Sequence, residues 1–110
     1  MKPCISEVTT LPSSFAEDVA NFADAGFTAM EVWLTKLETH LRSHSIDDTR
    51  KLLQDRQMTL AASSYQGGLL LSQGEQRKAH FDHFRQRLDL CQQLNIGTML
   101  IVADFATAVD

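Results

Sequence analysis

The fold is decided by one stretch of sequence, Asp24-Ala25-Gly26-Phe27-Thr28-Ala29-Met30-Glu31-Val32-Trp33. Gly26 can take the left-handed conformation that ends a helix. The residues that follow predict a strand over 27–34, in which alternate side chains share a face. Met30 and Val32, and Leu34 after them, are expected to face outer helices, whereas Glu31 and Trp33 face the other side of the sheet.

The segments on both sides repeat this helix-then-strand unit. Ser14-Phe15-Ala16-Glu17 is a capping box that begins one helix, and Ser45 caps another over 46–55. We also predict a short helical turn over 36–41, a long helix over about 73–94, and strands over 3–8, 58–63 and 98–102. Strands that alternate with helices indicate a parallel α/β sheet.

The composition indicates one globular domain, residues 1–110, of 44% hydrophobic and 22% charged residues. The net charge of −4 and the absence of a basic cluster argue against a nucleic-acid partner. No apolar run approaches the roughly 20 residues that span a bilayer, and residues 1–6 lack the apolar core of a signal peptide. We therefore expect no membrane partner, a cytoplasmic location, and Cys4 and Cys91 as reduced core residues.

The passages into three strands resemble those of xylose-isomerase-like TIM barrels. Residues 23–33 are similar to the pattern A-x-x-G-[FY]-x-x-[VI]-E-[LIV], with Met30 in place of the β-branched residue. Residues 53–60 are similar to L-x-x-x-G-L-x-[LIV], in which Gln57 replaces the glycine of the pattern and Met58 replaces its second leucine. Residues 94–102 resemble the passage into strand four, with Asn95 at the glycine. The resemblance covers nearly the whole chain but only half of a barrel of eight βα units.

The resemblance implies a fold and, with it, a kind of chemistry. The expected fold class is α/β, the first four parallel strands of a (β/α)8 TIM barrel, as a half-barrel or a fragment. The superfamily includes sugar-phosphate isomerases and epimerases, inosose dehydratases and apurinic endonucleases. The leading expectation is therefore part of a sugar or sugar-phosphate isomerase or epimerase of carbohydrate metabolism, which moves a proton next to a carbonyl.

A divalent metal ion, Mn, Mg, Co or Zn, is implied for the full-length protein by the resemblance. The family holds it mostly with residues of the later strands, so we assign no metal ligand to this sequence. Residues 1–110 alone are expected to be inactive. The catalytic residues remain unknown.

The candidate substrate-binding residues stand within or near the ends of the predicted strands, where barrel enzymes place their active sites. Glu31 either orients a substrate hydroxyl or anchors the barrel through a buried hydrogen bond. Trp33 either packs against a sugar ring or is a core aromatic. Tyr65 and Gln66 follow strand three, where a plain loop is the alternative. Glu7 and Asp104 could equally be caps or solvated loop residues. The six candidates are Glu7, Glu31, Trp33, Tyr65, Gln66 and Asp104.

The histidines give a weaker signal. His40 and His44 have the i, i+4 spacing of a helical metal pair, but no H-E-x-x-H pattern accompanies them. His80 and His83 are expected at the surface of the long helix, facing a neighbour or solvent. No nucleophilic triad, P-loop or G-x-G-x-x-G motif is present.

Two other readings stay open. An apurinic-type nuclease would need histidines at the ends of strands three and four, where Tyr65-Gln66 and Ala103-Asp104 stand. A non-catalytic half-barrel assembly module is the alternative of a different class. Its two open sheet edges and apolar inner face would favour a homo-oligomer that closes them.

Overall fold

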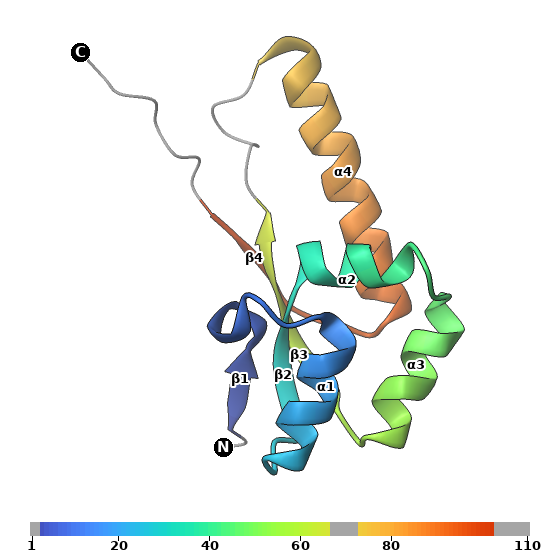
Figure 1. Ribbon diagram of the computed structural model, residues 1–110. Helices are drawn as coiled ribbons and strands as arrows, with labels where there is room; N and C mark the ends of the chain where they lie inside the picture. The colour runs from blue at the N-terminus through green and yellow to red at the C-terminus, as the bar shows by residue number, and fades with distance from the viewer. Residues whose placement is uncertain (1–2, 67–72, 103–110) are drawn as a thin grey trace, which may run out of the picture.

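The computed structural model describes residues 3–66 and 73–102 as four parallel strands with helices between them (Figure 1). The strands lie in the order β1-β2-β3-β4, so neighbours in the chain are neighbours in the sheet. This confirms the predicted parallel α/β fold. The elements are β1 (Cys4–Ser6), the 3₁₀ turn η1 (Glu7–Thr10), α1 (Phe15–Asp24), β2 (Ala29–Trp33), α2 (Leu34–Leu41), α3 (Ile46–Asp55), β3 (Thr59–Gln66), α4 (Gly74–Gln93) and β4 (Met99–Ile101).

Local chemistry sets the ends of the helices. The Ser14 hydroxyl accepts from the Glu17 N–H at 3.2 Å while the Glu17 carboxylate accepts from the Ser14 N–H at 3.3 Å. Ser45 and Asp48 make the same reciprocal pair at the start of α3. Gly26 and Asn95 follow α1 and α4 with positive φ angles of 95° and 58°, as expected for the residues that end these helices.

The helices cover one face of the sheet (Figure 1). The outward-pointing Met30 and Val32 of β2 are fully buried against them, as the alternation predicted. Glu31 and Trp33 point the other way and are only half-buried. The buried apolar cluster on the helix side comprises Phe15, Val19, Phe22, Met30, Val32, Leu34, Leu37, Leu53, Met58, Leu60, Cys91, Leu94 and Ile96.

All four strands differ by one or more residues from their predicted bounds, and the ends of the first three have a structural cause. The first strand ends at Ser6 because the Ser6 hydroxyl accepts from the Val8 N–H and starts the turn η1. The second ends at Trp33, since Leu34 is already the first residue of α2. The third continues to Gln66, whose carbonyl accepts from the Val102 N–H at 2.9 Å and so keeps the pairing to β4.

One cysteine is also placed differently from the prediction. Cys91 is buried in α4, as expected, whereas Cys4 is exposed on β1. Among the described strands β1 pairs only with β2, so its other edge gives Cys4 no cover. Both thiols are free.

The longest helix, α4, carries many charged residues along its 20 positions. Within 3–66 and 73–102, none of the helices combines the length and the apolar character that a bilayer crossing requires.

Candidate functional site

The carboxyl ends of the strands bring several of the predicted residues to one edge of the sheet. Glu7 follows β1, Trp33 ends β2 and Gln66 ends β3. Because the strands are parallel, these ends share one edge, which is where barrel enzymes bind their substrates. Asp104, the sixth candidate, lies outside the described residues, as do Gly67 and Gly68.

Glu31 and Trp33 lie on the face of the sheet that the helices leave open. Glu31 is in register with Ser6 of β1 and with Ala62 of β3, so its carboxylate lies over the middle of the sheet. Trp33 is in register with Ser64 at the carboxyl edge. Both side chains are half-buried, which leaves part of each surface open to a ligand. Their role in substrate binding stays a prediction.

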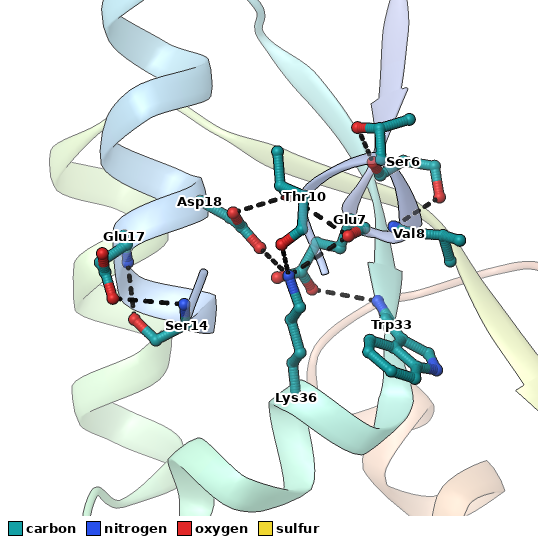
Figure 2. A network of polar contacts seen from close by, with 10 residues as sticks. Ser6, Glu7, Val8, Thr10, Ser14, Glu17, Asp18, Trp33 and Lys36 are labelled. Carbon is teal, nitrogen blue, oxygen red and sulfur yellow. Dashed lines mark hydrogen bonds and ion pairs between the residues drawn. The ribbon is translucent and has the colours of Figure 1, made fainter. Parts of the chain in front are cut away.

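Glu7 is not open in this way, because its side chain is 0% exposed. Its Oε1 accepts a hydrogen bond from the Trp33 N–H at 3.0 Å, which ties the end of β1 to the end of β2 (Figure 2). Its Oε2 is buried and has no hydrogen-bond partner among the described residues. The predicted contact of Glu7 with a substrate stays a prediction, and the structure buries Glu7 against the backbone of Trp33.

A buried ion pair lies beside Glu7. Lys36 of α2 and Asp18 of α1 meet with Nζ and Oδ2 2.7 Å apart, and their side chains are 7% and 1% exposed. Lys36 Nζ also donates to the carbonyls of Glu7 and Thr10, at 3.2 and 2.6 Å. The Thr10 hydroxyl donates to Asp18 Oδ1 at 2.8 Å. We call Glu7, Asp18 and Lys36 the acidic cluster, because it contains two carboxyls and one ammonium.

The protonation of Glu7 follows from this setting. Burial raises the pKa of Glu7 to about 9, and the neighbouring Asp18 acts in the same direction. The Trp33 N–H and the Lys36 ammonium lower the pKa, but by less. Glu7 therefore carries its proton at neutral pH, when a solvated glutamate would be ionised.

A second polar cluster fixes the end of β3. Arg87 of α4 holds the Glu38 carboxylate of α2 with two hydrogen bonds, Nη2 to Oε1 at 2.7 Å and Nε to Oε2 at 3.2 Å. Arg87 Nη1 donates to the Tyr65 carbonyl at 3.0 Å and to Gln66 Oε1 at 3.3 Å. His83 contacts the same carboxylate at 2.5 Å. We call Glu38, His83 and Arg87 the basic cluster.

Charge in the basic cluster has the opposite effect on its carboxyl group. Partial burial by itself would raise the pKa of Glu38. The hydrogen bonds and charges of Arg87 and His83 outweigh it, and the pKa of Glu38 is lowered from its ordinary value. Glu38 is therefore ionised at neutral pH.

Tyr65 and Gln66 have different surroundings although they are adjacent. The Tyr65 side chain is 42% exposed, and it is held through its carbonyl. Gln66 is buried, with its side chain turned to Arg87. Tyr65 is thus the better placed of the two to meet a ligand.

His40 and His44 lie together, as their spacing predicted. Their rings stack with centroids 4.1 Å apart, and they line a pocket of about 430 Å³ between α1 and α2. Burial, and then the proximity of His44, lower the pKa of His40. Within the described residues, no three His, Cys, Asp or Glu side chains converge in a way that could hold a metal ion. Residues 3–66 and 73–102 thus do not supply a complete metal site, and we assign no ligand to them.

Sequence reasoning named Glu7 but missed its charged partners Asp18 and Lys36, and it missed the basic cluster. Asp18 interrupts the apolar stripe of Phe15, Val19 and Phe22, and Arg87 lies between Phe84 and Cys91 on α4. A charged residue on an otherwise apolar stripe is the signal that could have found them, since a buried charge requires a partner.

The chain matches a known protein family. A family described as xylose isomerase-like TIM barrel matches residues 19–110. No curated protein matches the chain.

Solved structures share the fold of the chain. The IolI protein with a bound zinc atom has a TM-score of 0.87 and 21% identity, over 100% of this chain and 40% of its own. A xylose isomerase domain protein from Alicyclobacillus acidocaldarius has a TM-score of 0.73 and 19% identity, over 90% of this chain and 35% of its own. The probable 3-DHS dehydratase AsbF from Bacillus anthracis has a TM-score of 0.72 and 18% identity, over 94% and 38%. The chain therefore spans at most 40% of the length of these three proteins.

Proposed function

Because the chain belongs to the xylose isomerase-like TIM barrel family, we propose that it forms one wall of the active site of a sugar or sugar-phosphate isomerase or epimerase. The observation that carries this proposal is the pairing of Glu31 and Trp33 on the open face of β2, near the carboxyl edge of the sheet. An indole face beside a carboxylate is a suitable surface for a sugar, which has apolar C–H faces and hydroxyl groups around its edge.

Each residue has a distinct role in this proposal. The Trp33 ring packs against the apolar face of the sugar, and the Glu31 carboxylate accepts hydrogen bonds from its hydroxyls. The exposed Tyr65 hydroxyl can donate or accept at the rim. These residues bind and orient the substrate, so that a proton can be moved at the carbon next to the carbonyl. The proposal assigns the groups that move this proton to residues outside 3–66 and 73–102.

The proposal includes a divalent metal ion, Mn, Mg, Co or Zn, in the complete protein. A bound zinc in the related IolI structure supports this part of it. The described residues provide no set of ligands for such an ion, and the roles proposed for Glu31, Trp33 and Tyr65 do not depend on it.

The test uses the protein expressed from its natural reading frame and saturated in turn with Mg²⁺, Mn²⁺, Co²⁺ and Zn²⁺. A panel of aldoses, ketoses and their phosphates is incubated in D2O, and deuterium at the carbon next to the carbonyl is followed by proton NMR. Incorporation that requires both protein and metal supports the proposal. No incorporation with any member of the panel contradicts it.

The pocket wall is tested with Trp33→Ala. We expect KM to rise by about tenfold, which corresponds to about 1.4 kcal/mol of lost binding. Trp33→Phe keeps an aromatic face and should lose less, while the matched control Leu88→Ala, at an exposed position of α4, should leave KM unchanged. Residues 1–110 alone should show no turnover in the same assay.

A second candidate function is an assembly module in which two copies of the chain close each other. It is favoured by the exposure of Leu100 and Ile101 on β4. Among the described strands, β1 pairs only with β2 and β4 only with β3, so each has one edge open for pairing with another copy. Light scattering on the purified natural protein tests this. A dimer that Leu100→Asp converts to monomer supports it, and a well-behaved monomer contradicts it.

A further inference from the structure

The buried Glu7 carboxyl is the group that the proposed function leaves unexplained. It lies at the junction of three elements, with Asp18 from α1, Lys36 from α2 and the Trp33 N–H from β2 around it (Figure 2). One of its oxygens is satisfied by Trp33 and the other finds no donor among the described residues. A buried acceptor without a donor is destabilising, so this oxygen requires either a partner or a change of protonation.

We propose that Glu7 is a positioning residue for Trp33, and that its carboxyl works in the protonated form, holding the end of β2 through the Trp33 N–H. This inference rests on the proposed function, in which Trp33 lines the substrate pocket. Glu7 itself touches no substrate in it.

The hydrogen bonds of Lys36 are the first argument for the proton. An ammonium has three N–H donors. Lys36 Nζ already makes three hydrogen bonds, to Asp18 Oδ2 and to the carbonyls of Glu7 and Thr10. It therefore has no further donor to offer the Glu7 carboxylate.

The balance of charge is the second argument. Lys36 and Asp18 form a pair that is neutral as a whole and almost completely buried. An ionised Glu7 would add one uncompensated negative charge to the same interior, which is costly. A proton removes this charge, in agreement with the pKa of about 9.

The proton also solves the problem of the unpartnered oxygen. A protonated Oε2 becomes a donor, and the adjacent Asp18 carboxylate is the acceptor toward which it can donate. Asp18 retains the capacity for this bond, because Oδ1 accepts a hydrogen bond from Thr10 and Oδ2 accepts one from Lys36, and each oxygen has two lone pairs. Glu7 then links Asp18 to the Trp33 backbone, so the position of the substrate wall depends on this one proton.

The experiment uses Trp33 as its own reporter, because it is the one tryptophan among these 110 residues. Any tryptophan beyond them in the natural protein is replaced by phenylalanine. Tyr65→Phe is the common background, because it removes the emission of the one tyrosine among these 110 residues. The emission of Trp33 is recorded from pH 6 to 10.5 in this background, with and without Glu7→Gln, and with the matched control Glu75→Gln on the exposed start of α4.

We expect a change of emission with a midpoint near pH 9 in the background protein and in Glu75→Gln. Glu7→Gln should remove this change and keep the neutral-pH spectrum, because an amide imitates the protonated carboxyl in shape and charge. The same midpoint in Glu7→Gln, or no change in the background protein, would overturn the inference.

Enzyme kinetics separate this inference from the proposed function. Glu7→Gln should keep KM within about twofold at pH 7, and Glu7→Ala should raise it by about tenfold, which is the effect of losing Trp33. If no substrate is found, the fluorescence titration still decides the role of the Glu7 proton. If Glu7→Ala does not fold, Glu7→Gln still decides it, because a large rise of KM in this isosteric variant contradicts the proposal.

Discussion

The acidic and basic clusters do the same structural work with opposite proportions of carboxyls and basic groups. The acidic cluster holds the end of β2 through the Trp33 N–H, and the basic cluster holds the end of β3 through the Tyr65 carbonyl. The first has two carboxyls for one cation, and the second has one carboxylate for an arginine and a histidine. The pKa of the carboxyl is accordingly raised in Glu7 and lowered in Glu38. Where buried carboxyls outnumber basic groups, one carboxyl is thus protonated. Where basic groups outnumber carboxyls, the carboxyl stays ionised.

Burial also differs between the clusters, and it should set the size of each mutational effect. Asp18 is 1% exposed, whereas the Glu38 side chain is 28% exposed. A charge that loses its partner in the first cluster cannot reach water, while one in the second can be partly hydrated.

The largest expected effect is that of Asp18→Ala, which leaves Lys36 buried without its counter-ion. We expect the free energy of unfolding to fall by about 3–5 kcal/mol, the range for breaking a buried pair. Urea denaturation at pH 7 measures it. The control is Asp24→Ala, which breaks the exposed pair with Arg56 and should cost at most about 1 kcal/mol. Equal losses in the two variants would contradict the view that burial decides the effect.

Arg87→Met should have the next largest effect, since it removes a bidentate pair and the bond to the Tyr65 carbonyl. The expected loss is about 2–3 kcal/mol, because hydrogen bonds to charged groups contribute about 1.5–3 kcal/mol each and Glu38 can regain water. Arg87→Lys should recover only part of this loss, because an ammonium lacks the planar fork. If Arg87→Lys is as stable as the wild type in the same denaturation experiment, the two parallel hydrogen bonds from the guanidinium to Glu38 are unimportant for stability.

The pH dependence of Glu7→Gln tests the difference in charge directly. The folded pKa of Glu7, about 9, lies above its ordinary value of 4.5, so the folded state binds more protons than the unfolded state between these values. The stability linked to this proton is complete below about pH 4.5 and is lost as the pH rises toward 9. Glu7→Gln needs no proton, so its stability relative to the wild type should rise by up to about 1.4 kcal/mol per pH unit in this window.

Thermal and urea unfolding at pH 5, 6, 7 and 8 provide the measurement. Parallel curves for the two proteins over this range would mean that Glu7 is ionised when folded. The basic cluster provides the contrast: the lowered pKa of Glu38 contributes stability that is present above about pH 4.5 and is lost as the pH falls through the folded value.

The smallest expected effect is that of His83→Ala. Arg87 keeps both hydrogen bonds to Glu38, and the His83 side chain is 41% exposed, so the loss should stay below about 1 kcal/mol. It should shrink further in 1 M salt, because exposed pairs are screened. A loss as large as that of Arg87→Met would place His83 at the centre of the basic cluster.

The elements with local signals were predicted well from the sequence. The capping box at Ser14, the serine cap at Ser45 and the positive φ angles of Gly26 and Asn95 each depend on residues close along the chain. The two faces of β2 also follow from simple alternation, and the structure confirms them for Met30 and Val32. The carboxyl edge of a parallel sheet then indicated where Trp33 and Gln66 would lie, whereas the end of β3 depended on its pairing with β4, which the local pattern does not contain.

The partners of the buried charges could be decided only by the tertiary structure. Asp18 and Lys36 are 18 positions apart, and Glu38 and Arg87 are 49 apart. No pattern within one helix specifies which distant charge will face it, because that choice depends on how α1, α2 and α4 pack against the sheet. The sequence alone thus determined the parallel α/β order and the faces of its strands, since backbone conformation and capping are short-range. Only the tertiary structure decided that Glu7 is buried beside a complete ion pair, since desolvation and charge balance are properties of the packed interior.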